Sequence, residues 1–179
     1  MIGSSAGGLS ALIGLLRELP ADHPAPIVIA AHGGPDSHLH EALSLSRGIV
    51  LPILQATDDM PLEGGAAYVL PGATHGLVVG RRLHLSPPVR GSRFRPSIDA
   101  LFMTAAASYG GGAVAVVLSG TMDDGMRGAQ VIYDLGGVTI VQDPDDAERA
   151  EMPQNVIAAD HPREILPAPA LGRWLAGIR

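Results

Sequence analysis

The chain has 179 residues, of which 46% are hydrophobic and 17% are charged, and it contains no cysteine. This composition predicts a globular protein with a substantial core, and it excludes disulfides, Cys-ligated metal sites and thiol chemistry. All 12 basic side chains are arginines, which excludes lysine bases and a Walker-type phosphate loop. A net charge of −6 argues against nucleic acid as the main partner. No apolar run reaches the ~18 residues that span a bilayer, so we expect a cytoplasmic protein without membrane insertion.

Two kinds of apolar pattern alternate along the chain. Helical spacing, with Pro20 as a terminator, N-cap Ser97 and closing glycines as boundary signals, predicts helices over Leu9–Leu19, His38–Leu45, Ile98–Ser108, Asp124–Leu135 and Arg163–Ile178. Short β-branched runs predict strands over Pro26–Ala31, Ala113–Leu118 and Val138–Val141. Alternating strands and helices indicate an α/β fold in which helices cover both faces of a mostly parallel sheet.

The middle of the chain follows a different pattern. Short strands are predicted at Ala67–Leu70, Leu77–Val79 and Leu83–Leu85, joined by Pro-Gly and Gly-Arg-Arg turns. We interpret them as a β-hairpin extension beside the main sheet. No repeat, low-complexity segment or internal linker is present, so residues 1–179 are expected to form one domain.

The chain begins with a G-x-S-x-G motif, Gly3-Ser4-Ser5-Ala6-Gly7, directly before a predicted helix. In a nucleophile elbow, small residues let the backbone turn sharply from strand to helix, which exposes the serine hydroxyl. Ser5 is then a candidate nucleophile, and the N–H of Ala6 at the helix start is a candidate oxyanion donor. The alternative is a glycine-rich turn that binds a phosphate or only joins two elements.

A nucleophilic serine needs a base and an orienting carboxylate. His32 follows one predicted strand, and Asp123 and Asp124 follow another. Because functional residues of parallel sheets gather at the carboxyl ends of the strands, these side chains are the candidates. His75 is a rival active-site neighbour.

The remaining histidines are interpreted as solvated or structural: His23, His38, His40, His84 and His161. His38 and His40 are too far apart on a helix to share a metal ion, so no metal is expected. Asp143, Asp145 and Asp146 are interpreted as a loop that caps the next helix.

Residues 81–95 contain five arginines and no acid, interleaved with prolines. Arg90, Arg93 and Arg95 could dock an acidic substrate. Alternatively, Arg93 or Arg95 pairs internally with an acid such as Asp99.

Taken together, these motifs resemble the catalytic domain of the chemotaxis protein-glutamate methylesterases, and the likeness covers essentially the whole chain. The segments that carry it are IGSSAGG, the strand ending at His32, LPGATH (70–75), SPPVRGSRFRPSIDALF (86–102), VVLSGTMDDGMRGA (116–129), QDPDDA (142–147) and EMPQNVI (151–157).

The resemblance implies a doubly wound three-layer fold and a serine hydrolase that removes methyl groups from receptor glutamates, with deamidation of glutamines as a second activity. Carried over by motif, Ser5 is the nucleophile, His32 the base and Asp124 the orienting acid. A second oxyanion donor would come from the backbone near Thr121. No cofactor is implied.

The implied partner is a methyl-accepting chemotaxis receptor or another methylated signalling protein. Members of this family usually carry a receiver domain before the catalytic domain, whereas only Met1 and Ile2 precede the Gly-rich turn here, so either the start is truncated or the first strand is clipped. Control through a fused receiver domain is not carried over, and a separate receiver domain is a candidate partner. The alternatives are a non-catalytic signalling module of the same fold and a nucleotide-binding domain.

Overall fold

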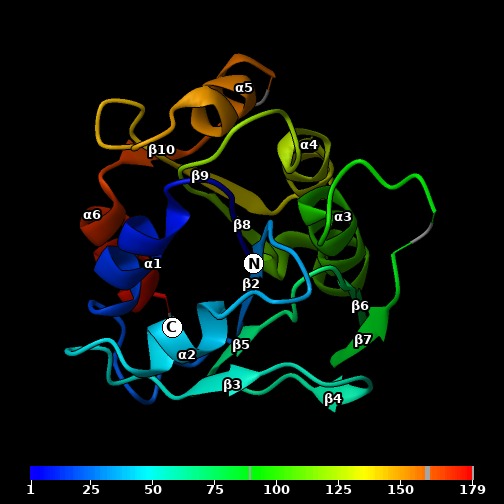
Figure 1. Ribbon diagram of the computed structural model, residues 1–179. Coiled ribbons are helices and arrows are strands. Elements are labelled where there is room, and N and C mark those ends of the chain that lie inside the picture. Colours follow the sequence, from blue (N-terminus) through cyan, green and yellow to red (C-terminus); the bar gives the residue numbers. More distant parts are fainter. Residues whose placement is uncertain (89, 160–161, 179) are drawn as a thin grey trace.

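The computed structural model describes residues 1–88, 90–159 and 162–178. A seven-stranded parallel sheet with the order β10-β9-β8-β1-β2-β5-β3 runs through its centre (Figure 1). Its strands are β1 (Ile2–Ser4), β2 (Ile27–Ala31), β3 (Ile53–Gln55), β5 (Ala67–Val69), β8 (Val114–Val117), β9 (Val138–Gln142) and β10 (Glu164–Leu166). Since β1 lies between β2 and β8, the carboxyl ends of these three strands meet at one edge.

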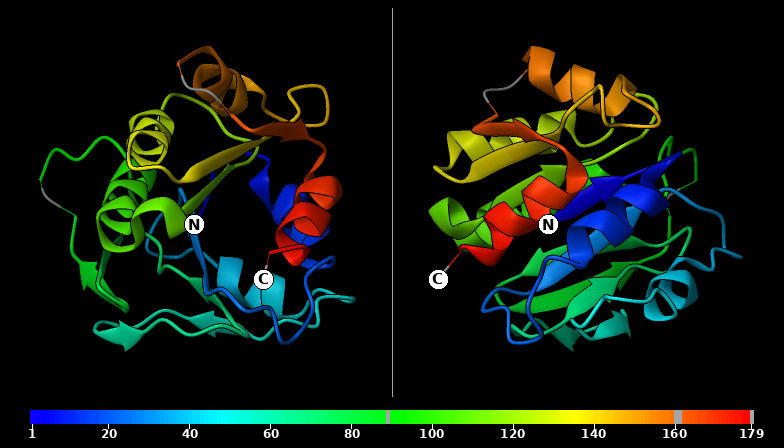
Figure 2. Two further views of the ribbon diagram at one scale, coloured as in Figure 1. Left: turned by 180° about the vertical axis from the view of Figure 1, so that it is seen from behind. Right: turned by 90° about the vertical axis from the view of Figure 1, so that its left-hand side faces the viewer.

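Helices cover both faces of this sheet, which gives the three layers visible in Figure 1. One face carries α1 (Gly8–Leu16), α2 (Leu39–Ser44) and α6 (Ala168–Ala176); the other carries α3 (Ile98–Tyr109), α4 (Met126–Asp134) and α5 (Glu151–Ala159). Figure 2 shows α1 and α6 side by side in front of the sheet. The predicted α/β fold, with a mostly parallel sheet in a doubly wound sandwich, is confirmed.

A small antiparallel sheet lies beside α3. It consists of β4 (Met60–Pro61), β7 (Arg82–Ser86) and β6 (His75–Val79) in that order. The β6–β7 hairpin is the predicted extension. The assignment of Ala67–Leu70 to it was wrong, because residues 67–69 form β5 inside the main sheet, between β2 and β3. Their apolar side chains are buried on both faces, as in a central parallel strand.

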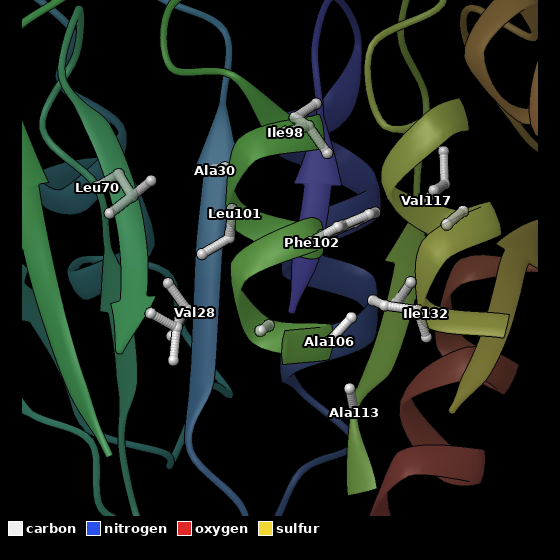
Figure 3. Packing of buried hydrophobic residues seen from close by; sticks show 14 of the residues in the cluster. Val28, Ala30, Leu70, Ile98, Leu101, Phe102, Ala106, Ala113, Val117 and Ile132 are labelled. Carbon is white, nitrogen blue, oxygen red and sulfur yellow. The ribbon is translucent and has the colours of Figure 1, made fainter. Parts of the chain in front are cut away.

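Packing between α3 and the sheet supplies much of one core. Phe102, Leu101 and Ile98 are fully buried and contact strand residues such as Val28 and Val117 (Figure 3). Burial of one such side chain stabilises a fold by about 1.5–3 kcal/mol. The N-cap at Ser97 is confirmed, since its Oγ accepts the N–H of Ala100 at 3.2 Å. This core therefore fixes the first turn of α3 relative to β1 and β8.

The C-terminal part of the chain differs from its prediction. The expected helix Arg163–Ile178 is shorter, because β10 occupies residues 164–166 and Pro167 precedes α6. Helix α4 begins at Met126 rather than at Asp124, and the turn before it holds the Asp124 side chain. His161 lies outside the described residues. Within the described ranges, no helix is both long and apolar enough to cross a membrane.

Candidate active site

Three side chains from adjacent strand ends form a hydrogen-bonded chain. Ser5 follows β1, His32 follows β2, and Asp124 lies in the turn after β8. The Oγ atom of Ser5 lies 3.1 Å from Nδ1 of His32, and Nε2 of His32 lies 2.7 Å from Oδ2 of Asp124. The Asp124 side chain is fully buried and that of His32 is 16% exposed, so this series of hydrogen bonds runs from Asp124 in the interior toward the surface at Ser5.

The His32 ring has a defined orientation. Its Nδ1 faces the hydroxyl and its Nε2 faces the carboxylate, the reverse of the chymotrypsin arrangement, in which Nε2 faces the serine. Turning the ring by half a revolution would place carbon atoms opposite both oxygens and remove both hydrogen bonds. Asp124 therefore accepts from Nε2–H, and Nδ1 keeps its lone pair toward Ser5.

The first turn of α3 holds Asp124 in place. Its Oδ2 accepts the N–H of Ile98 at 2.7 Å, and its Oδ1 accepts the N–H of Asp99 at 2.9 Å. The hydroxyl of Ser97 lies 3.4 Å from the same Oδ1. Helix N-termini favour negative charge, so this environment suits a buried carboxylate. Of the two neighbouring aspartates, the structure therefore brings Asp124 to His32, whereas Asp123 faces Arg93.

Asp99 ties α3 to the turn that carries Asp124. Its Oδ1 accepts the N–H groups of Gly125 at 3.0 Å and Gly128 at 2.8 Å. Burial raises the pKa of the Asp99 carboxyl and the Asp124 carboxylate raises it further, while the two glycine N–H groups and Arg127 oppose the rise. From the sequence, Asp99 was predicted only as a partner for arginine, and this role was not predicted.

The backbone of the Ser5 turn leaves an N–H free. The carbonyl of Ser5 accepts the N–H of Gly8 at 2.9 Å. In a trans peptide the C=O and the following N–H point in opposite directions, so the N–H of Ala6 points away from the helix. The carbonyl of Ala6 is fixed by the Ser119 hydroxyl at 3.0 Å. Among the described residues, nothing accepts the N–H of Ala6.

A second peptide group lies against Ser5. The carbonyl of Gly120 accepts the N–H of Met152 at 3.0 Å, so the N–H of Thr121 in the same peptide points away from α5. It also lacks an acceptor in the part of the chain that the structure describes. A Cβ built on Gly120 would lie 2.8 Å from Cβ of Ser5 and closer still to Sδ of Met152. Only glycine permits this approach. This contact between Gly120 and Ser5 was not predicted, because the two residues lie far apart in the sequence.

Ser5 and His32 open onto a cleft of about 420 Å³ whose lining also includes Phe94, Arg93, Arg95 and Met122. The Phe94 ring stacks on His32, with centroids 5.2 Å apart and planes inclined by 8°. The guanidinium of Arg93 lies 4.9 Å from the Phe94 centroid and 3.3 Å from Asp123. Phe94 thus covers one face of the imidazole, a contact that was not predicted from the sequence.

The predicted docking arginines fall into two groups. Arg93 and Arg95 line this cleft, whereas Arg90 is exposed and is not part of its described lining. Arg93 does pair internally, but with Asp123 rather than with Asp99, which binds glycine N–H groups instead. A second hollow, of about 390 Å³, lies on the other side of Ser5 and is bordered by Leu9, Leu39 and Glu148.

The other histidines serve separate sites. His38 pairs with Glu41 at 2.6 Å, and His84 lies 3.8 Å from Asp59. His40 faces the carbonyl of Ile53. His75 accepts the N–H of Ser97 on Nδ1 at 3.0 Å, so it reaches Asp124 only through Ser97.

His23 lies far from the site, at the amino edge of the sheet. It is fully buried beside a cavity of about 90 Å³, and both ring nitrogens lack a partner within the described residues. Burial lowers its pKa below 6.5.

The acidic loop at residues 143–146 binds the start of α6 rather than the start of α5, the helix that follows it in the chain. Oδ2 of Asp146 accepts the N–H of Ala168, the first residue of α6, at 2.9 Å. Among the described residues, no group of three potential metal ligands is assembled.

Comparison with known proteins identifies the family. The family model described as CheB methylesterase matches residues 1–175. Protein-glutamate methylesterase/protein-glutamine glutaminase 1 of Bordetella avium is 38% identical over 169 residues, which are 93% of this chain and 49% of that protein. Protein-glutamate methylesterase FrzG of Myxococcus xanthus is 35% identical over 177 residues, 97% of this chain and 52% of that protein. This chain thus spans about half the length of these relatives.

A solved structure extends the comparison to three dimensions. The CheB methylesterase catalytic domain of Thermotoga maritima superposes with a TM-score of 0.90 at 29% sequence identity, covering 98% of this chain and 95% of that one. The likeness therefore extends over nearly the whole chain. The chain belongs to the CheB methylesterase family.

Proposed function

We propose that this protein is a serine esterase that hydrolyses glutamate methyl esters on signalling proteins, with glutamine deamidation as a second activity. The observation that carries the proposal is the hydrogen-bonded series from Ser5 through His32 to the buried Asp124. It lies at the same edge as the N–H groups of Ala6 and Thr121, which have no acceptor among the described residues. A hydroxyl, a base, an orienting acid and oxyanion donors are the parts that acyl transfer requires. The names of the relatives from Bordetella and Myxococcus support the substrate class.

In the first half of the reaction, Oγ of Ser5 attacks the ester carbonyl and Nδ1 of His32 takes the hydroxyl proton. The N–H groups of Ala6 and Thr121 stabilise the negative oxygen of the tetrahedral intermediate. Asp124 stabilises the imidazolium by accepting from Nε2–H. When the intermediate collapses, the C–O bond to the methoxy group breaks, His32 returns its proton to that oxygen, and methanol leaves a glutamyl-enzyme.

In the second half, His32 removes a proton from water, and the hydroxide attacks the glutamyl ester. Collapse then breaks the bond to Oγ, and Ser5 recovers its proton from His32. A glutamine side chain would follow the same route with ammonia as the leaving group. No cofactor enters either half.

The proposed partner is a methyl-accepting chemotaxis receptor or another methylated signalling protein in the cytoplasm. Arg93 and Arg95 in the cleft wall, and Arg90 beside it, would attract a segment whose modification site is flanked by acids. A receiver domain is a further proposed partner.

The decisive experiment compares Ser5→Ala with Ser10→Ala, whose exposed hydroxyl lies 3.3 Å from the carbonyl of Gly7 in the same turn. A fluorophosphonate should label the unmodified protein and Ser10→Ala but not Ser5→Ala, and only Ser5→Ala should lose hydrolysis of a methylated receptor peptide. A loss of at least about 1,000-fold is expected for removal of a nucleophile. Absence of labelling and turnover in the unmodified protein would instead indicate a non-catalytic module.

A further inference from the structure

Three chain segments are hydrogen-bonded to one another beside His32. The N–H of Gly33 donates to the carbonyl of Arg95 at 3.1 Å, and the N–H of Ala73 donates to the carbonyl of Gly33 at 3.1 Å. The N–H of Ser97 donates to Nδ1 of His75 at 3.0 Å and closes the ring of contacts. The segment that follows the base is thereby tied to the segment that opens α3. The link runs through the turn before β6.

This turn has an unusual backbone. Ala73 adopts a φ of 59°, in the left-handed region that residues other than glycine rarely adopt. Such a conformation persists where surrounding contacts over-determine it, and such positions cluster at functional sites. Here the N–H of Ala73 is committed to Gly33, while His75, two residues later, is committed to Ser97.

Ser97 is where this ring meets the active site. Its Oγ caps α3 at Ala100 and lies 3.4 Å from Oδ1 of Asp124. The next two amides of the chain donate to the same carboxylate. The orientation of the peptide at Ser97 therefore sets the direction of the donors that hold Asp124. His75 holds that peptide.

The bond from His75 is not needed to attach the hairpin to α3. Further along β6, the N–H of Val78 donates to Oγ1 of Thr104 at 3.0 Å, and the carbonyl of Val78 accepts the Ser108 hydroxyl at 3.0 Å. These contacts anchor the hairpin in the middle of the helix. The contact at His75 acts only at the helix end that binds Asp124.

We infer that His75 is a positioning residue for the esterase reaction: its Nδ1 lone pair orients Ser97 and, through Ser97, the carboxylate that aligns His32. The inference rests on the proposed function in its use of Asp124 as the orienting acid. It requires a neutral ring with the proton on Nε2. Loss of the acceptor leaves the half-buried N–H of Ser97 unpaired and loosens the first turn of α3.

The test compares His75→Phe, which keeps the ring and removes the acceptor, with His75→Asn, whose side-chain oxygen can replace Nδ1. His75→Phe should lower kcat for a small neutral ester about 10- to 100-fold with little change in KM, because slight misplacement of a catalytic group has effects of that size. His75→Asn should recover most of the activity. The downfield proton resonance of His32 Nε2–H should weaken or move in His75→Phe and return in His75→Asn.

Thr104→Val is the matched control, since it removes a hydroxyl from the same hairpin–helix interface away from Asp124. It should lower the melting temperature without changing kcat or the His32 resonance. An unchanged His32 resonance and kcat in a folded His75→Phe would overturn the inference. So would failure of His75→Phe to fold, with or without rescue of folding by His75→Asn, while Thr104→Val folds, because the contact would then serve the fold rather than the alignment of His32. The resonance is observed without substrate, so it remains informative even if the protein proves not to be an esterase.

Discussion

Ser5 faces Nδ1 of His32, the ring nitrogen nearer the backbone, across 3.1 Å. With Nε2 engaged by Asp124 at 2.7 Å, the proposed proton transfer starts from a tautomer opposite to that of chymotrypsin-type enzymes. The short arm between Nδ1 and the main chain means that the position of the base depends directly on the backbone at His32. The ring of contacts through Gly33, Ala73 and Arg95 fixes that backbone.

Nitrogen NMR will test this orientation. In the neutral resting protein, we expect Nδ1 of His32 to resonate as an unprotonated ring nitrogen and Nε2 as a protonated one, because Asp124 needs a donor. His32→Gln identifies the signals by their loss. Ser5→Ala should leave the tautomer unchanged, since Asp124 determines it. A proton on Nδ1 in the neutral ring would contradict the reversed arrangement.

Gly120→Ala should abolish activity while the protein stays folded. The new methyl group would collide with Cβ of Ser5 and with Sδ of Met152, displacing the nucleophile from the N–H of Thr121. Loss of one oxyanion donor alone costs about 100- to 1,000-fold in kcat. Gly112→Ala is the control, because a Cβ at Gly112 meets nothing within 4 Å. Activity close to normal in Gly120→Ala would remove the Gly120–Thr121 peptide from the proposed mechanism.

Arg95→Gln should raise KM for a methylated peptide flanked by acidic residues several-fold, and should leave hydrolysis of a small neutral ester unchanged. Arg95 lines the cleft beside Ser5, where its charge can attract an acidic segment. Salt should reduce the difference, since the screening length is about 10 Å at 0.1 M. Arg173→Gln makes the same change in charge at an exposed residue paired with Glu18 on the α1–α6 face, so an equal effect there would argue against docking.

Acid should destabilise the protein through His23. Burial lowers the pKa of His23 in the folded protein, so below pH 6.5 the unfolded chain binds more protons than the folded one. The free energy of unfolding therefore decreases as the pH is lowered. His23→Leu should be at least as stable as the unmodified protein at about pH 7. The difference in free energy of unfolding, in favour of His23→Leu, should grow as the pH is lowered to about pH 5. Exposed His38→Leu should show no such gain.

Urea denaturation across this pH range measures the differences. Parallel curves for the His23→Leu and unmodified proteins would show that His23 does not contribute.

The strand ends that carry Ser5, His32 and Asp124 could be predicted because the evidence for them is local: a small-residue motif before a helix, and polar residues after β-branched runs. What the sequence could not supply were contacts between distant segments. The parallel partners of Ala67–Val69, the choice of Asp123 for Arg93 and the stacking of Phe94 on His32 all depend on tertiary packing. Strand β10 was not predicted, because three residues are too few to show the alternation of apolar and polar residues that is typical of a strand.

The order of the sheet has a consequence for folding. Strands β1, β2 and β8 are neighbours, yet Asp124 follows Ser5 by more than half the chain, so the site cannot form until β8 docks against β1. Such long-range parallel pairing is intrinsically slow. Recovery of serine labelling during refolding will therefore lag behind the recovery of helical signal, and the interval will time the docking of the two halves of the sheet.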